Sequence, residues 1–243
     1  MKQFIHLFAA ILALSTSVDG QELTKKKVII LTGANNHNWR ETTPVLEQIL
    51  EASGEFSVDT VSDPEKLTPD LLTNYDVLLS NWNSYGKQKP APWSEELKAA
   101  YVEFVKNGGG HVSVHAGSSS FDKWDAYQAI GLAGWKGKTR HKAIHVFEVR
   151  ISNSDHPITA GLEPFKTRDE LWIHPYVQPE ATILAESFSK TTENWESTAL
   201  VGHYGEGRCF TLLLGHDAIT MQSDGFKALL LRGIGWAAHT KVK

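Results

Sequence analysis

Residues 108–118 read Gly108-Gly109-Gly110-His111-Val112-Ser113-Val114-His115-Ala116-Gly117-Ser118, and this stretch decides the fold. A glycine-rich turn leads into a short apolar strand at 111–114, which ends at a histidine between small residues. This spacing is typical of a nucleophile elbow, a tight strand-to-helix turn that pushes its central side chain into a pocket. The pattern predicts a strand of an α/β protein that ends at a functional residue, His115.

The segments on either side extend this pattern. Strand-like runs are found at 27–31, 56–61 and 75–80, and helical patterns at 40–53 and 94–106. The second half has further strand-like runs at 144–151, 181–186, 198–202 and 209–214, followed by a helical pattern at 223–238. Strands that alternate with helices predict a doubly wound, mostly parallel α/β sheet with helices on both faces.

The first twenty residues have the features of a secretory signal peptide. Lys2 supplies a positive start, and residues 4–14 form an apolar stretch followed by small or polar residues. Because a membrane-spanning helix needs roughly 20 apolar residues, no stable membrane insertion is expected. We therefore expect a signal peptide at 1–20, one domain at 21–243, and an exported protein that is periplasmic or secreted.

Charge and cysteine content exclude several classes of protein. The formal net charge is −4, and the chain has no run of basic residues beyond Lys25–Lys27, so nucleic acid is not an expected partner. Cys209 is the single cysteine, which rules out an intramolecular disulfide. Its apolar neighbours predict that it is buried as a small hydrophobic residue.

Three histidines follow predicted strands. Ligands of open parallel sheets bind at the carboxyl ends of the strands, where we expect His37, His115 and His216. The three imidazoles could meet and bind a divalent metal such as zinc, with His141 as a reserve ligand. A histidine at the elbow also excludes attack by a thiolate or alkoxide, which leaves acid–base catalysis, metal binding or a structural role for His115.

Two acidic residues are further catalytic candidates. Glu170 could act as a carboxylate base, and a solvated loop is the alternative. Asp217 directly follows His216 and could serve the same site or cap the segment that follows it.

Amides and tryptophans near the strand ends form a pattern that suggests a sugar ligand and is not specific to one. Asn35 and Trp39 follow the first strand, Asn81 and Trp82 follow the third, and Trp172 lies close to Glu170. Amides bind hydroxyl groups and an indole stacks on the apolar face of a sugar ring. Packing in the core remains the alternative for each tryptophan.

Several motifs share their order and spacing with one family. They are the stretches 108–117, 155–162, 169–172, 205–208 and 214–217, which together extend across nearly the whole predicted mature chain. With them the sequence resembles the ThuA-like family of the class I glutamine amidotransferase-like, flavodoxin-related superfamily. The resemblance implies that His115 stands where amidotransferases carry cysteine, so neither glutaminase activity nor a nucleotide cofactor is expected.

The resemblance also implies a role in the catabolism of trehalose and of related glycosides oxidised at C3. Loss of the C1 substituent by elimination, followed by hydration, needs a base, an acid and an oxyanion stabiliser. On this hypothesis His115 or Glu170 takes the proton, and His216 or a metal supports the enolate oxygen. The segment 197–203 departs from the family's usual aromatic-containing pattern, which leaves the substrate open.

Two other functions stay open at this level. The domain could be a non-catalytic carbohydrate-binding module that keeps the fold without the chemistry, or it could dock onto a partner enzyme. A small-molecule carbohydrate is the expected partner, and the sequence leaves room for a homo-oligomer.

Overall fold

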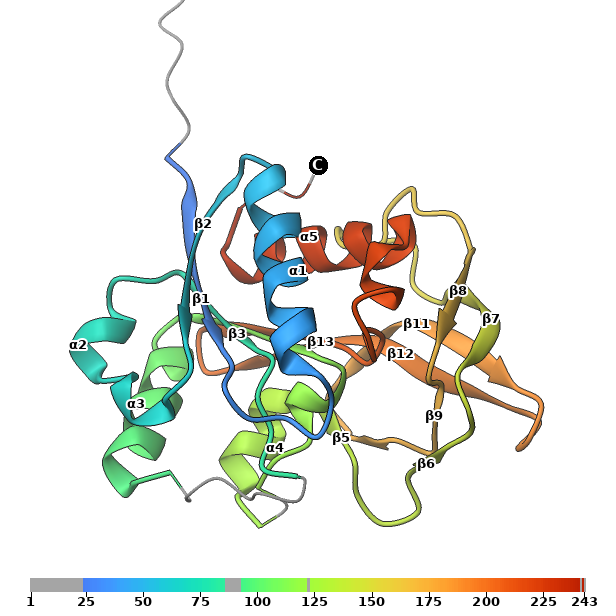
Figure 1. Cartoon of the computed structure of the whole chain (residues 1–243), viewed down its shortest axis with the longest axis horizontal. Helices are drawn as coiled ribbons and strands as arrows, with labels where there is room; N and C mark the ends of the chain where they lie inside the picture. The colour runs from blue at the N-terminus through green and yellow to red at the C-terminus, as the bar shows by residue number, and fades with distance from the viewer. Residues whose placement is uncertain (1–23, 86–92, 122, 241, 243) are drawn as a thin grey trace, which may run out of the picture.

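A nine-stranded sheet of mixed direction runs through the molecule in the order β2-β1-β3-β4-β13-β12-β11-β7-β8 (Figure 1). The computed structural model describes residues 24–85, 93–121, 123–240 and 242. The signal peptide expected at 1–20 lies outside these residues and stays a prediction.

Five strands form the parallel half of the sheet. They are β2 (Phe56–Val61), β1 (Lys26–Leu31), β3 (Val77–Ser80), β4 (Gly110–Val114) and β13 (Gly207–Leu212). All neighbouring pairs in this half are parallel, and Val28 of β1 lies in register with Val58 and Val77. These strands coincide with the predicted ones to within a few residues, and the α/β fold is confirmed.

Helices cover both faces of the parallel half. One face carries α1 (Trp39–Ala52) and α5 (Asp224–Ala237), and the other carries α3 (Glu95–Lys106), α4 (Asp125–Gly131) and the short α2 (Pro69–Leu72) (Figure 1). Because strand residues alternate between faces, Val28 and Ile30 pack in the core under α1 and α5, whereas Ile29 and Leu31 pack in the core under α3 and α4. The hydroxyl of Ser94 accepts the N–H of Leu97, which confirms the expected helix start.

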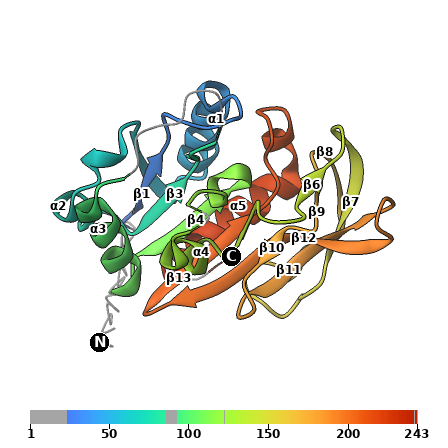
Figure 2. The same ribbon diagram turned by 90° about the horizontal axis from the view of Figure 1, so that it is seen from below.

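The other half of the sheet is antiparallel and lies on the side of the molecule away from α2 and α3 (Figure 2). It consists of β12 (Asn194–Tyr204), β11 (Thr182–Ser189), β7 (His145–Ile151) and β8 (Phe165–Asp169). Two small ribbons pair β5 (Ala133–Gly134) with β10 (Tyr176–Val177) and β6 (Arg140–His141) with β9 (Trp172–Ile173). Three short 3-10 helices complete the described elements: η1 (Pro64–Lys66), η2 (His115–Ser118) and η3 (Thr220–Gln222).

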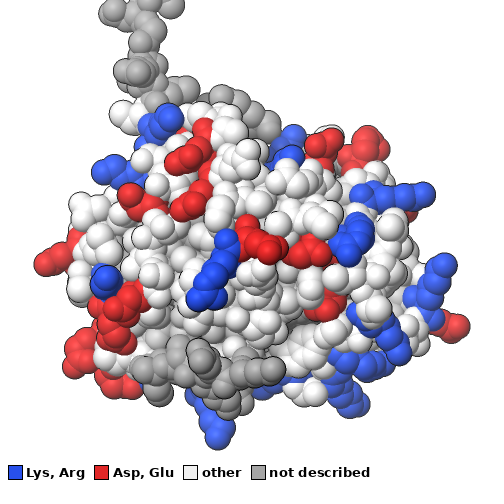
Figure 3. Space-filling view, in the orientation of Figure 1, with Lys and Arg blue, Asp and Glu red and all other residues white. Residues whose placement is uncertain are grey.

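Cys209 lies fully buried in β13, as its apolar neighbours predict. Burial raises the pKa of its thiol to about 12, so it is an inert packing residue. On the surface, basic and acidic side chains both occur on the face shown in Figure 3. Among the described residues, no helix has the length and apolar character needed to span a membrane.

Candidate functional site

Four side chains from distant parts of the chain meet at the carboxyl edge of the parallel strands. His37 follows β1, His115 follows β4, Glu170 follows β8 and His216 follows β13. One candidate ligand atom from each residue lies within 4.8 Å of the others. The ring centroids of the three histidines are 4.5–5.4 Å apart. The strand-end rule therefore correctly predicts that these imidazoles gather.

Glu170 stands at the centre of this group. Its Oε2 atom lies 3.9 Å from Nε2 of His37, 3.5 Å from Nε2 of His115 and 3.4 Å from Nδ1 of His216. Four ligands in a tetrahedron with bonds of about 2.1 Å are separated by about 3.4 Å, so these spacings suit one small divalent ion.

The outer nitrogens of two rings are held by oxygen acceptors. Nδ1 of His115 lies 2.8 Å from the carbonyl oxygen of Leu213, and Nδ1 of His37 lies 3.2 Å from Oδ1 of Asn35. A ring nitrogen that faces an oxygen carries the proton, so each Nε2 turns a lone pair toward Glu170. Metal-binding histidines are oriented in this way by the groups behind them.

Two inner nitrogens have no hydrogen-bond partner among the described residues. They are Nε2 of His115 and Nδ1 of His216, and both atoms are buried. A buried polar atom without a partner costs about 1–3 kcal/mol, and a metal ion would satisfy both atoms together. The donor set of three imidazoles and one carboxylate thus fits a divalent ion, in agreement with the ligands predicted from the sequence, with Glu170 as a fourth.

The charge states also suit metal binding. Burial and the neighbouring histidines lower the pKa of His37 to about 3, so its ring is neutral at pH 7. Burial raises the pKa of Glu170, but the interactions with the nearby His115 and His216 rings outweigh it and hold that pKa below its usual range. The interaction with Glu170 raises the pKa of His216. In the metal-free protein the carboxylate of Glu170 is therefore ionised, and its negative charge attracts cations to the cluster.

The backbone at the elbow explains why His115 points into the site. Its φ is +48°, a left-handed conformation that is strained for a residue with a side chain. Behind it, a Cβ atom on Gly117 would lie 2.2 Å from the carbonyl oxygen of Ser80, so only glycine fits. This geometry is the nucleophile elbow that the sequence predicts, with an imidazole at its tip.

A cavity of about 230 Å³ opens beside the cluster. Its lining consists of Asn36, His37, Tyr85, Ala116, Ser119, Trp135, His141, Glu170 and Trp172. His141 lies at the rim, with Nδ1 2.9 Å from Oε1 of Glu170. Trp172 is buried, and its Nε1–H has no acceptor among the described residues. The cavity has room for one sugar ring, and the unpaired Nε1–H of Trp172 in its wall favours a polar ligand.

The other residues predicted to bind sugar lie outside this lining. Asn35 supports His37 from behind. Asn81 is buried and donates to the hydroxyls of Thr42 and Thr43. These amides hold the loops of the site in position.

The two remaining tryptophans also lie outside the cavity lining. Trp82 is buried and stacks on Phe121 at a centroid distance of 5.6 Å, which is the core-packing alternative. Trp39 begins α1 and lies under the guanidinium of Arg40.

Asp217 is not one of the four residues of the cluster, and its carboxylate is bound elsewhere. Its Oδ2 lies 3.1 Å from a guanidinium nitrogen of Arg168, and its Oδ1 accepts the N–H of Thr220. These contacts match the alternative role given to Asp217, that of a cap for the following segment.

Sequence reasoning missed several residues of the site. Tyr85, Ser119 and Trp135 line the cavity, although no periodicity or motif marks them. Asp169 was also not singled out, although it binds the segment that carries His216. The only signal for Asp169 in the sequence is its position beside Glu170, at the start of the motif stretch 169–172.

Comparison with protein families matches residues 27–237 to the ThuA model, described as trehalose utilisation. A putative ThuA-like protein from Parabacteroides merdae is similar at 30% identity and a TM-score of 0.80, over 90% of this chain and 92% of that one. A second from Bacteroides uniformis has 17% identity and a TM-score of 0.65, over 88% and 91%. A β-galactosidase from Rahnella sp. R3 shares the fold at 16% identity and a TM-score of 0.59, over 88% of this chain and 31% of the galactosidase. No curated protein matches the chain.

Proposed function

Because the chain belongs to the ThuA family, described by trehalose utilisation and so tied to carbohydrate metabolism, we propose that it is an exported, metal-assisted enzyme that cleaves glycosides oxidised at C3. The observation that carries this proposal is the convergence of three imidazoles and Glu170 beside a cavity with room for one sugar ring. The small-molecule partner is then a 3-keto-glycoside such as 3-keto-trehalose.

We assign one divalent ion such as zinc to His37, His115, Glu170 and His216. Neutral imidazole and carboxylate are suitable donors for zinc and for other divalent ions of the first transition row. When bound, the ion supplies Lewis-acid stabilisation for the negative charge that develops on a sugar oxygen.

His141 is the residue best placed to move a proton. Its Nδ1 faces Oε1 of Glu170 at 2.9 Å and the carbonyl oxygen of Lys142 at 3.0 Å, so this nitrogen carries the ring proton. The lone pair is left on Nε2 of a side chain that lines the cavity. An imidazole oriented by a carboxylate is the usual arrangement of a general base.

The reaction then follows from the acidity of the C2 proton beside the C3 keto group. His141 takes this proton, the electron pair forms a C1=C2 double bond, and the bond between C1 and the glycosidic oxygen breaks. The protonated His141 returns its proton to the departing oxygen. Water next adds across the double bond, with its hydroxyl on C1 and its proton on C2. The products from 3-keto-trehalose are 3-keto-glucose and glucose.

The test measures metal content and turnover together. Purified mature protein with about one zinc ion per chain should release glucose from 3-keto-trehalose. His216→Ala should lose the zinc, whereas His141→Gln should keep it and lower kcat about 10²- to 10⁴-fold. His145→Gln is the matched control, because His145 is exposed near the same ribbon, outside the cavity lining, and its Nδ1 faces the carbonyl oxygen of Ala143.

The second candidate function is a sugar-binding module without catalysis. The favouring observation is that the elbow carries His115 in place of a nucleophile. Full zinc occupancy with unchanged 3-keto-trehalose, together with saturable sugar binding, would establish this alternative.

Export rests on the sequence of residues 1–20. We expect mass spectrometry of the protein from its native cells to give an amino terminus near Gln21. A protein that retains Met1 would contradict export by a cleaved signal.

A further inference from the structure

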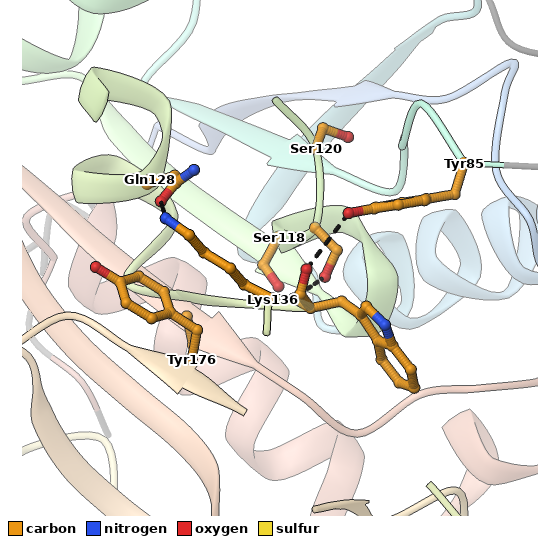
Figure 4. Close-up of a pocket in the computed structure, with 10 residues that line it drawn as sticks. Tyr85, Ser118, Ser120, Gln128, Lys136 and Tyr176 are labelled. Carbon is orange, nitrogen blue, oxygen red and sulfur yellow. Dashed lines mark hydrogen bonds between the residues drawn. The ribbon is translucent and has the colours of Figure 1, made fainter. Parts of the chain in front are cut away.

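A second hollow adjoins the cavity of the candidate site (Figure 4). Its lining consists of Tyr85, Ser118, Ser119, Ser120, Gln128, Ala133, Gly134, Trp135, Lys136 and Tyr176. We call it the side pocket. The side pocket and the main cavity share three lining residues, Tyr85, Ser119 and Trp135. A ligand in the main cavity therefore contacts residues that also line the side pocket.

The size of the side pocket limits what it accepts. It holds about 20 Å³, compared with about 230 Å³ for the main cavity. A single water needs roughly 10–15 Å³ by this measure, so the side pocket takes one or two heavy atoms. A second sugar ring is too large, whereas a hydroxymethyl group has a suitable size.

Ser119 provides a donor at the junction of the two spaces. Its Oγ accepts the backbone N–H of Trp135 at 2.8 Å, and the residue is only 5% exposed. A hydroxyl has one hydrogen to donate, and the described residues offer no acceptor for the hydrogen of Ser119. The hydroxyl hydrogen is therefore available to an oxygen atom of a ligand.

Lys136 provides positive charge on the same wall. Its Nζ lies 2.9 Å from Oε1 of Gln128 and 4.8 Å from the ring centroid of Tyr176. Figure 4 shows the side chain of Lys136 running toward Gln128 beside Tyr176. Both partners are neutral, and no described carboxylate lies within ion-pair distance. The ammonium therefore keeps donor capacity for an oxygen atom of a ligand.

We propose that the side pocket binds the hydroxymethyl group on C5 of the sugar ring and so selects hexosides over pentosides. This inference rests on the proposed function, because it assumes a sugar ring in the main cavity with C2 and C3 at the histidines. In the pose that we propose, C5 lies across the ring from C2 and directs its substituent toward Tyr85, Ser119 and Trp135, the lining residues that the two spaces share. The hydroxymethyl oxygen then accepts from Ser119.

The test uses methyl α-glucoside and methyl α-xyloside, which differ only in the hydroxymethyl group. Neither has a keto group, so neither reacts, and NMR titration of the zinc-loaded protein measures binding alone. The hydroxymethyl oxygen of the glucoside gains one charge-assisted or two neutral hydrogen bonds that the xyloside cannot form. We therefore expect the glucoside to bind more tightly by roughly 10- to 100-fold. Ser119→Ala should lower this ratio several-fold by weakening glucoside binding.

Two further variants keep the inference testable if the Ser119→Ala protein does not fold. Lys136→Gln should lower the ratio several-fold, and Lys138→Gln, an exposed neighbour outside the side pocket, should leave it unchanged. Equal binding of the two sugars by the wild type overturns the side-pocket inference and leaves the proposed function standing. Tighter binding of methyl glucuronide than of the glucoside also overturns it, since the side pocket then selects a carboxylate. Binding of neither sugar overturns this inference, and release of glucose from 3-keto-trehalose then decides the proposed function separately.

Discussion

Asp169 and His216 are joined by a hydrogen bond in which the backbone N–H of His216 donates to Oδ1 of the carboxylate at 3.2 Å. The other oxygen of Asp169 accepts the N–H of Gly215 at 2.7 Å, and Oδ1 also accepts the N–H of Glu170. Asp169 is fully buried. One carboxylate thus holds the two backbone segments that carry Glu170 and His216 at a fixed separation.

Replacement of Asp169 should weaken metal binding without removing a ligand. In Asp169→Asn the amide offers a single acceptor oxygen, so at least one of the backbone hydrogen bonds is lost. Loss of a group that orients metal ligands typically costs 10- to 100-fold in affinity, and we expect a change of this size in the Kd for zinc. Competition with a chelating dye measures it. Asp155→Asn, on an exposed turn, is the control, and equal affinities in the two variants would refute the positioning role of Asp169.

Zinc should stabilise the folded protein. A ligand that binds only the folded state at 100 times its Kd adds about 2.7 kcal/mol to the free energy of unfolding. For a chain of this length that corresponds to a rise in Tm of roughly 5–10 °C. Differential scanning fluorimetry with and without a chelator checks this, and His115→Ala, which lacks one proposed ligand, should show no zinc-dependent shift.

The parallel half of the sheet and three of the four cluster residues follow from simple sequence rules. Residues after β1, β4 and β13 must meet, because parallel strands place their carboxyl ends at one edge of the sheet. His37, His115 and His216 are therefore found together. The same rule also selects Asn81 and Trp82 after β3. The rule does not predict the direction of a side chain, however, and both of these side chains are buried in the protein interior.

The remaining part of the site depends on contacts between distant segments. Glu170 follows β8, which lies at the far antiparallel edge of the sheet, and no local pattern shows that its loop turns back over β4. Tyr85, Ser119 and Trp135 lie on loops whose paths depend on how the small ribbons pack. Sequence periodicity indicates which face of a single helix or strand is buried. It gives no information on contacts between segments that are far apart in the sequence.

Gly117 should tolerate no side chain. In Gly117→Ala the new Cβ would lie 2.2 Å from the carbonyl oxygen of Ser80, so the backbone of the elbow must move. Overpacking of this kind costs about 3 kcal/mol, which urea unfolding measures. Gly137→Ala is the matched control, because Gly137 has a φ of +62° with nothing near its Cβ position and should lose only about 1 kcal/mol. Equal losses in the two variants would argue against the close contact at the elbow.

His111 should make the fold sensitive to acid. It lies in β4, is 1% exposed, and its Nδ1 is 3.3 Å from the hydroxyl of Tyr101. Burial lowers the pKa of His111 to about 3, from 6.5 in the unfolded chain. Between these two values the unfolded chain binds a proton that the folded protein does not, so the free energy of unfolding falls as the pH falls through this window. His111 contributes no pH dependence above pH 6.5.

The expected size of this effect is about 1.4 kcal/mol per pH unit below 6.5, or roughly 2.7 kcal/mol at pH 4.5. Urea unfolding of the zinc-free protein at pH 7.5 and 4.5 gives the total loss for the wild type, to which His37 contributes with the same sign because its pKa is also lowered to about 3. His111→Gln, which keeps a neutral polar side chain beside Tyr101, should lose about 2.7 kcal/mol less than the wild type over the same interval. If both proteins lose the same amount, the His111 ring takes up its proton in the folded state and is not held neutral by burial.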